Sequence, residues 1–528
     1  MTYRVFISDP LSEDGIYPLQ EADDMEVVQE TDLTNEQLHE RLTDYDALLV
    51  RSQTKVTREL IENAHRLKVI GRAGVGVDNI DLEAATEYGI MVVNAPDGNT
   101  NSAAEHTMAM LASLARNIPQ ADAALKQNRW DRKAYVGVEM KGKTLGIVGL
   151  GRVGAEVAAR AQGQRMNVIA YDPFLTAEQA DNLGIRSGSV ADVLQAADFI
   201  TAHTPLLNET KHIINKEAFE QMKDGVRIVN CARGGIIDED ALYEAIINQK
   251  VAGAGLDVFE EEPVYDHKLL ELPEVIATPH LGASTVEAQR NVAIDVSNDV
   301  VTILRGGVTQ NAVNMPSVPQ DIMNQIAPYF DLAAKLGTFL AYLEQDAVEE
   351  IHVYYAGELA EMDVTPLTRN TVKGLLKRHL GNRVNDVNAA FLAEKKGITI
   401  HEQKTSATNG FTDLLTAEIK TKSSIRQVAG TLLRGLGARI VKIDHYSMDL
   451  SPQGHMVFIR HNDQPGAIGR VGGLLADNQV NIATMQVGRT EIGGEAIMML
   501  VIDKPLKQHE LNQLKELTEV HDATAVEL

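Results

Sequence analysis

The sequence is poor in cysteine and in basic side chains, and each shortage excludes a class of protein. A single cysteine, Cys231, occurs in 528 residues, which excludes an intrachain disulfide framework and indicates a reducing, cytoplasmic compartment. Lysine and arginine number 49 against 74 acidic residues, which gives a net charge of −25. Because nucleic-acid affinity comes chiefly from phosphate neutralisation, no nucleic-acid partner is expected, although a local basic pocket for a small anion stays open.

Apolar runs long enough to cross a bilayer are also missing, and the first residues, MTYRVFISDPLSEDG, lack the layout of a signal peptide. No membrane partner is therefore expected. With 44% hydrophobic and 23% charged residues, the composition is that of a globular protein. A chain of this length predicts roughly three or four domains.

The strongest signal is the stretch KGKTLGIVGLGRVGAEVAARAQGQRMNVIAYDP. A short apolar run leads into Gly149-x-Gly151-x-x-Gly154, an alanine-rich helical segment follows, and a second apolar run ends at Asp172. This strand–turn–helix–strand order is the context of a dinucleotide fingerprint, in which the glycines allow the tight turn, the approach of a pyrophosphate and close helix packing. The phosphates then lie at the helix N-terminus, where free N–H groups point outward.

Asp172 lies 23 residues after Gly149 (172 − 149), close to where the fingerprint requires an acid. A carboxylate there accepts hydrogen bonds from the ribose hydroxyls of NAD and repels the 2′-phosphate of NADP. Glycines also occur in ordinary turns, so a lone GxGxxG is weak evidence. The strand, helix and acid in register nevertheless predict an NAD site.

A separate α/β lobe precedes the fingerprint. Short apolar runs at residues 4–7, 25–28, 47–50, 68–70 and 91–93 alternate with helical or polar connections, which predicts parallel strands. GxGxxG is absent from this part of the sequence, so the lobe is not expected to hold the cofactor.

Two loops of this first lobe are candidate substrate contacts. Arg51 follows one predicted strand, and Arg72 lies in the glycine-rich loop GRAGVGVD after another. Ligands of open α/β sheets collect beyond the carboxyl ends of the strands, where backbone N–H groups and arginines can hold an anion. The alternative is a solvated arginine beside a flexible turn.

The turn-rich segment NAPDGNTN predicts a crossover into a second lobe that ends near residue 279. Ser102-x-x-Glu105 resembles a capping box and predicts a helix through Arg116. Further strands are expected at residues 199–201, 227–230, 255–258 and 275–277. An amphipathic helix over residues 284–305 would return to the first lobe, so two crossings would form a cleft with a hinge.

Three motifs follow predicted strands of the second lobe and lie on the edge where a nicotinamide would bind. They place Arg233 in NCARGGIID, Glu262 in DVFEEEP and His280 in TPHLGA. Oxidation of a 2-hydroxy acid needs a base for the hydroxyl proton, an acid that orients that base, and a cation for the carboxylate and the carbonyl formed, which these residues supply. Each residue alone could be an ordinary surface or turn residue.

Cys231 has no base close to it in the sequence, so it is expected to line the cofactor site and not to act as a nucleophile. No cluster of histidine, cysteine or acidic residues shows metal-ligand spacing, so no metal is expected.

After a linker at residues 315–319, the chain continues with a mixed helix and strand pattern. A basic cluster on one expected helix, Lys373, Lys377, Arg378 and His379, is either a solvated face or an anion pocket. The last segment has the order β-α-β-β-α-β of a ferredoxin-like module. Asp463-x-Pro465-Gly466 lies where its first strand gives way to a helix, and the free N–H groups there suit a small carboxylate ligand. We interpret this module as regulatory.

The motifs resemble those of the D-isomer-specific 2-hydroxyacid dehydrogenases. The resemblance rests on VGLGRVG with Asp172, NCARGGIID, GLDVFEEEP and TPHLGAST, and GRAGVGVDNID and NDQPGAIGRVGGLL extend it to the long members of the family. It covers the chain from end to end. It implies an α/β fold: a two-lobed Rossmann-like dehydrogenase, with an NAD-binding lobe and a flavodoxin-like substrate lobe, followed by an α+β intervening domain and a ferredoxin-like ACT domain. The implied bounds are 1–96 with 284–314 for the substrate lobe, 97–283 for the NAD lobe, 315–452 and 453–528.

The resemblance also assigns residues. It implies Arg233, Glu262 and His280 as the catalytic set. Cofactor contacts are implied at Gly149, Gly151, Arg152, Val153, Gly154, Asp172, Thr204, Cys231, Ala232, Asp257, Gly282 and Ala283. Substrate contacts are implied at Arg51, Arg72, Gly74, Val75 and Arg132. In the ACT domain, Asp463 and Asn481 match effector positions, and the effector would be L-serine.

The resulting hypothesis is NAD-dependent oxidation of 3-phospho-D-glycerate to 3-phosphohydroxypyruvate by a homodimer or homotetramer, with L-serine feedback. The alternatives are a dehydrogenase for another D-2-hydroxy acid, a reductase of 2-oxoglutarate, and a non-catalytic NAD-sensing protein. The complete set of arginine, glutamate and histidine argues against the last of these.

Overall fold

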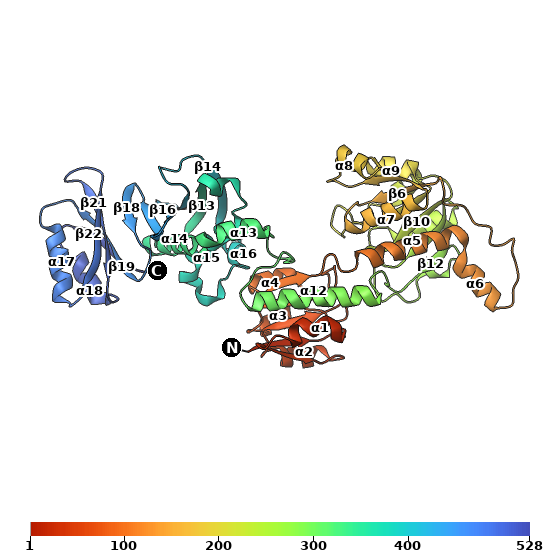
Figure 1. The fold of residues 1–528 in the computed structure, drawn as a ribbon, viewed down its shortest axis with the longest axis horizontal. Helices are drawn as coiled ribbons and strands as arrows, with labels where there is room; N and C mark the ends of the chain where they lie inside the picture. The colour runs from red at the N-terminus through yellow and green to blue at the C-terminus, as the bar shows by residue number, and fades with distance from the viewer. Residues whose placement is uncertain (1) are drawn as a thin grey trace.

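The computed structural model describes residues 2–528, which form four sheets arranged along an elongated molecule. The second lobe and the C-terminal domain lie at opposite ends, with the first lobe and the middle domain between them (Figure 1). The predicted fold class is confirmed. Within residues 2–528, no helix combines the length and the apolar character needed to cross a bilayer.

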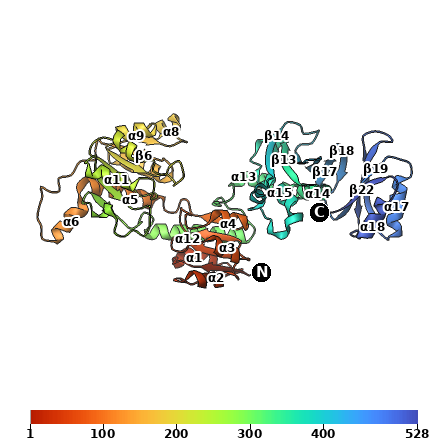
Figure 2. The ribbon, with the colours of Figure 1, turned by 180° about the vertical axis from the view of Figure 1, so that it is seen from behind.

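The first lobe is a parallel five-stranded sheet of order β2-β1-β3-β4-β5, the flavodoxin-like order. Its strands are β1 (Tyr3–Ile7), β2 (Met25–Gln29), β3 (Ala47–Val50), β4 (Val69–Arg72) and β5 (Met91–Asn94). Its helices are α1 (Glu13–Gln20), α2 (Asn35–Leu42), α3 (Arg58–Asn63) and α4 (Leu82–Glu87). The long helix α12 (Val286–Leu304) returns from the second lobe and packs on β4 and α1. Both views show it beside α1 (Figures 1 and 2).

The second lobe is a parallel seven-stranded sheet of order β12-β11-β10-β9-β6-β7-β8. Its strands are β6 (Thr144–Val148), β7 (Asn167–Tyr171), β8 (Arg186–Ser187), β9 (Phe199–Ala202), β10 (Val226–Asn230), β11 (Val251–Leu256) and β12 (Val275–Ala277). Its α-helices are α5 (Thr100–Arg116), α6 (Ile118–Lys126), α7 (Arg152–Gly163), α8 (Ala177–Asn182), α9 (Val190–Ala196), α10 (Lys216–Gln221) and α11 (Glu239–Ile247). Because all strands are parallel, the segments after β6, β10, β11 and β12 meet at one edge.

Two local predictions in this lobe are wrong. The capping box at Ser102 does not form, because α5 begins at Thr100 after the N-cap Asn99, and the Ser102 hydroxyl instead lies 2.7 Å from the Thr285 hydroxyl at the start of α12. The strand expected at residues 255–258 is β11, which begins at Val251. Gly255 within it lets α5 approach, since a Cβ there would lie 3.2 Å from a Leu114 methyl group.

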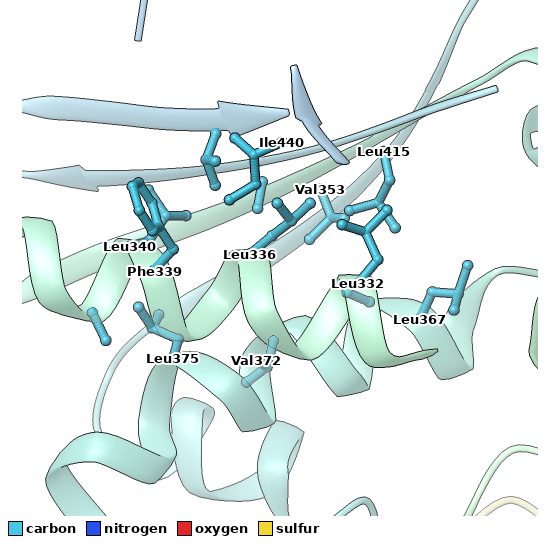
Figure 3. Packing of buried hydrophobic residues seen from close by; sticks show 14 of the residues in the cluster. Leu332, Leu336, Phe339, Leu340, Val353, Leu367, Val372, Leu375, Leu415 and Ile440 are labelled. Carbon is cyan, nitrogen blue, oxygen red and sulfur yellow. The ribbon is translucent and has the colours of Figure 1, made fainter. Parts of the chain in front are cut away.

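The middle domain is a mixed six-stranded sheet of order β14-β13-β15-β16-β17-β18, covered on one face by helices. Its strands are β13 (Val348–Ala356), β14 (Thr399–Thr405), β15 (Leu414–Thr421), β16 (Ile425–Leu433), β17 (Gly437–Ile443) and β18 (Tyr446–Leu450), and its helices are α13 (Gln320–Ile326), α14 (Phe330–Leu343), α15 (Thr365–Leu380) and α16 (Ala389–Lys395). Leu332, Leu336 and Leu340 point from α14 into the sheet (Figure 3). Burying each such leucine contributes about 1.5–3 kcal/mol.

Of the basic cluster on α15, Lys373 and Arg378 have partners within the domain, whereas Lys377 and His379 are exposed. Lys373 pairs with Asp386 at 2.7 Å, and Arg378 donates to the Ala341 carbonyl at 2.8 Å and covers the Tyr342 ring. These contacts pack α15 against its neighbours, so they favour a structural role over an anion pocket.

The C-terminal domain has the predicted order β-α-β-β-α-β: β19 (His455–Asn462), α17 (Ala467–Asp477), β20 (Ile482–Arg489), β21 (Glu495–Ile502), α18 (Gln508–Lys515) and β22 (Val520–Glu527). Gly466 is the N-cap of α17, so Pro465 lies just before the helix. Met456 and Phe458 of β19 share one buried cluster with Leu336 of the middle domain. The two domains therefore pack as one core, and cutting the chain near residue 452 would expose it.

Candidate active site

His280 and Glu262 form a hydrogen-bonded pair at the sheet edge of the second lobe. The Nδ1–H of His280 donates to Glu262 Oε2 at 2.7 Å, and the other carboxylate oxygen accepts from the Phe259 amide at 3.0 Å. The imidazole is 49% exposed. With Nδ1 engaged, Nε2 is the ring atom left to exchange a proton with a substrate.

The carboxylate of Glu262 is suited to hold an imidazole in its charged form. Burial raises its pKa, but the hydrogen bonds from His280 and Phe259 outweigh burial, and the pKa lies below its ordinary value. Glu262 is therefore ionised at neutral pH and stabilises a proton on His280.

A buried carboxylate positions the loop that carries His280. Asp257 accepts from the Thr278 hydroxyl at 2.6 Å and from the amides of Leu281 and Gly282 at 2.7 and 2.8 Å, and His106 Nε2 lies 3.2 Å from it. These contacts hold His280 at a φ of 55°, in the left-handed region that side chains rarely adopt. The Asp257 side chain is enclosed in this conformation, and its contact with the cofactor stays a prediction.

Arg233 of the second lobe contacts the glycine-rich loop of the first lobe. Its Nε donates to Asp78 Oδ2 at 3.1 Å, and its Nη1 donates to the Ala232 carbonyl at 2.7 Å. Gly76 makes room for it, since a Cβ there would lie 2.1 Å from Nη2. Sequence reasoning missed Asp78 and His106, although Asp78 ends the GRAGVGVD motif.

Arg72 brings a second guanidinium to the same place. It lies under Gly74, where a Cβ would be 1.5 Å from its Nη1, and its buried Nε has no hydrogen-bond partner within residues 2–528. Burial, and then the charges of Arg233 and Arg51, lower its pKa to about 10. An anion bound here would reduce the repulsion between the guanidinium groups and could accept a hydrogen bond from the Arg72 Nε–H, so the site is suited to an anion.

The other predicted substrate contacts flank this group. Gly74 has a φ of 155°, and the Val75 carbonyl accepts from Asn94. The backbone amide of Arg51 donates to Asp9. Arg132 lies in the exposed segment between α6 and β6, and its contact stays a prediction.

The fingerprint glycines have the geometry that a pyrophosphate requires. Gly149 has a φ of 96°, and a Cβ on Gly154 would lie 2.2 Å from the Gly149 carbonyl oxygen. At Gly151, the N-cap of α7, a Cβ would have no neighbour within 4 Å, which leaves space for a ligand. Arg152 and Val153 begin that helix, and Arg152 pairs with Asp97.

The contacts of the other predicted residues with the cofactor stay predictions. Asp172 is fixed by the amides of Leu150 and Phe174 at 2.8 and 2.9 Å, and the Thr204 hydroxyl is buried without a hydrogen-bond partner in the described part of the chain. Ala232, Gly282 and Ala283 follow β10 and β12. Burial first, and then the Asp257 charge, raise the pKa of Cys231 to about 12, which excludes an activated nucleophile.

Family models match three parts of the chain. Residues 108–282 match the NAD-binding domain of D-isomer specific 2-hydroxyacid dehydrogenases, residues 325–444 match the D-3-phosphoglycerate dehydrogenase intervening domain, and residues 455–519 match the ACT domain.

Whole-chain relatives settle the family. D-3-phosphoglycerate dehydrogenase of Bacillus subtilis is 48% identical over 526 residues, covering 100% of this chain and 99% of its own length. The enzyme of the same name from Methanocaldococcus jannaschii is 45% identical, covering 99% of this chain and 100% of its own length. The chain belongs to the D-3-phosphoglycerate dehydrogenase family. It is an NAD-dependent oxidoreductase.

Solved structures resemble the two lobes of this family member. D-lactate dehydrogenase from Aquifex aeolicus, complexed with NAD and lactic acid, is 30% identical with a TM-score of 0.54, over 60% of this chain and 100% of that chain. The TT0316 protein from Thermus thermophilus is 32% identical with a TM-score of 0.54, over 59% of this chain and 99% of that chain. The similarity supports NAD as the cofactor.

Proposed function

We propose that this chain oxidises 3-phospho-D-glycerate to 3-phosphohydroxypyruvate with NAD, the first committed step of phosphorylated serine synthesis. The observation that carries the substrate class is the gathering of Arg51, Arg72 and Arg233 where the two lobes meet, because a substrate with two anionic groups, a carboxylate and a phosphate, neutralises their mutual repulsion. The shared name of the whole-chain relatives supports the same substrate.

The residues act as follows. Bound NAD supplies the hydride acceptor. His280 takes the hydroxyl proton at Nε2 while Glu262 stabilises the imidazolium through Nδ1. Arg233 holds the substrate carboxylate and polarises the carbonyl that forms. Arg51, Arg72 and the loop at Gly74 and Val75 bind the remaining charge.

A second candidate is another D-2-hydroxy acid dehydrogenase, or a reductase of a 2-oxo acid such as 2-oxoglutarate. It is favoured by the D-lactate dehydrogenase that matches the two lobes. Such a substrate carries a carboxylate for Arg233 but lacks a phosphate for the remaining arginines.

A substrate panel tests the proposal. NADH formation with 3-phospho-D-glycerate, D-lactate and D-2-hydroxyglutarate is expected to be fastest with 3-phospho-D-glycerate, and NADP is expected to give a much lower kcat/KM than NAD because Asp172 repels the 2′-phosphate. A higher kcat/KM with an unphosphorylated acid would favour the second candidate.

We also propose L-serine as an effector of the ACT domain, bound near Asp463 and Asn481 in a homodimer or homotetramer. Asp463 lies at the turn between β19 and α17, pairs with Arg489 at 3.0 Å and accepts from the Gly493 amide. The backbone N–H of Asn481, just before β20, donates to the Asp503 carboxylate, just after β21. The hydrogen bond from Arg489 lowers the pKa of Asp463, so the carboxylate is ionised and can accept from an ammonium group.

L-serine is expected to reduce turnover of the full chain, and Asp463→Ala is expected to remove that response while uninhibited turnover stays near normal. Point variants are preferable to truncation because the ACT domain shares its core with the middle domain. An unchanged serine response in Asp463→Ala would place the effector elsewhere. Sedimentation of the full chain measures the oligomer.

We also propose that the domains meet at residues 96/97, 283/284, 314/315 and 452/453, because each resulting domain contains one sheet. We propose a cytoplasmic location because the chain has a single cysteine.

A further inference from the structure

The sheet of the middle domain has a face that its helices leave uncovered, and ionisable side chains gather there. In β13, Ile351, Val353 and Tyr355 point into the core beneath α14 and α15, so Glu350 and His352 point to the opposite face. β14 runs parallel to β13, and His401 pairs directly with His352.

Three of these side chains converge. Ligand atoms of Glu350, His352 and His401 all lie within 4.8 Å of one another. His352 Nε2 is 2.8 Å from Glu350 Oε2, and the rings of His352 and His401 stack with centroids 4.4 Å apart. The His352 and Glu350 side chains are 16% and 31% exposed, so the cluster is shielded but reachable from solvent.

We propose that Glu350, His352 and His401 bind a divalent transition-metal ion of the Zn²⁺ class. Two imidazoles and one carboxylate are a donor set that such an ion prefers, and a water completes a tetrahedron. Ions that prefer only oxygen donors, such as Mg²⁺ and Ca²⁺, are excluded by the two nitrogens.

The neighbours of the cluster act as the outer layer of a metal site. Lys420 donates to Glu350 Oε1 at 3.0 Å, which leaves Oε2 for the ion. The Gln403 side-chain nitrogen lies 3.4 Å from His352 Nδ1. When this amide is turned over by 180°, its oxygen takes that place, accepts the Nδ1–H and keeps Nε2 free for the metal. Outer contacts of this kind orient ligands in metal sites.

Only side-chain rotation is needed to bring the three donor atoms to the distances of a metal site. Tetrahedral Zn²⁺ with bonds of about 2.0–2.1 Å places its donors roughly 3.4 Å apart, so the stacked rings must turn toward a common point. The ligands stand on two hydrogen-bonded strands, so the backbone is already in place. His352 and His401 are 49 residues apart (401 − 352), which explains why ligand spacing in the sequence predicted no metal.

A second cluster, His106, Cys231 and Asp257, has ligand atoms at similar separations, but Asp257 and His106 already contact the active-site loop. It is the competing place for an added ion. A thiolate ligand has a spectroscopic signature that separates the two.

The test measures Zn²⁺ and Co²⁺ binding by the full chain, without a polyhistidine tag, after equilibrium dialysis. The wild type is expected to bind one equivalent of metal, and its Co²⁺ complex is expected to show the absorption of a site with nitrogen and oxygen ligands. His352→Gln and His401→Gln are each expected to lower the affinity at least tenfold. Affinity is expected to fall as pH drops below the range where imidazole is neutral. His65→Gln, at an exposed histidine of the first lobe, is the matched control and is expected to bind as the wild type does.

Equal binding by the wild type and both cluster variants would overturn the proposal, as would the absence of binding by a folded wild type. A sulfur-to-cobalt charge-transfer band would place the ion at Cys231. Since both histidines lie on the uncovered face, the circular dichroism spectrum of each variant is expected to match that of the wild type. A matching spectrum shows that weaker metal binding comes from the lost ligand and not from unfolding.

Discussion

His280→Asn is expected to lower kcat with 3-phospho-D-glycerate by about 10²–10⁴-fold, the usual contribution of a general base. Asparagine cannot accept the hydroxyl proton, and the Glu262 carboxylate loses the imidazolium that it stabilises. Asparagine tolerates a left-handed backbone, so the loop at φ 55° is preserved. NADH binding, measured by fluorescence titration, is expected to stay near normal.

His212 supplies a matched control on the same lobe. It forms a second histidine–glutamate pair, with Glu260 at 2.9 Å, and it also has a left-handed φ, 51°. His212→Asn therefore replaces the same side chain at a position with the same left-handed backbone conformation, yet it is expected to leave kcat near the wild-type value. Near-normal turnover in His280→Asn, or equal losses in both variants, would remove His280 from the proposed mechanism.

Features that depend on local sequence were predictable. The left-handed backbone at Gly149 and the close approach at Gly154 follow from one tight turn followed by a helix, and the structure has both. The meeting of Glu262 and His280 follows from parallel strands, whose carboxyl ends must share an edge. The β-α-β-β-α-β order of the last domain also followed from short-range periodicity.

Features that depend on packing were not predictable. Asp78 reaches Arg233 only because two lobes close on each other, and nothing within either motif encodes that orientation. Ser102 has the spacing of a capping box, but the approach of Thr285 gives its hydroxyl another partner. The shared core of the middle and C-terminal domains likewise joins segments far apart in the chain.

Arg233→Gln is expected to lower kcat/KM with 3-phospho-D-glycerate by about 10²–10³-fold, the cost of removing one donor that stabilises charge developing on oxygen. Glutamine keeps part of the hydrogen-bonding capacity but lacks the charge and the fork that hold a carboxylate. Arg233→Lys is expected to recover only part of the loss, because a point charge cannot make the bidentate contact.

Stability measurements separate this loss from unfolding. The charge of Arg233 is, after burial, the largest influence that lowers the pKa of Arg72, so removing that charge relieves the repulsion between the two guanidinium groups. The melting temperature of Arg233→Gln is therefore expected to match or exceed that of the wild type even though activity falls. Asp78→Asn removes the carboxylate that Arg233 contacts and leaves the guanidinium in place, so its effect on kcat/KM is expected to be far smaller. Equal losses in Asp78→Asn and Arg233→Gln would mean that the ion pair between the two lobes, and not contact between Arg233 and the substrate, limits catalysis.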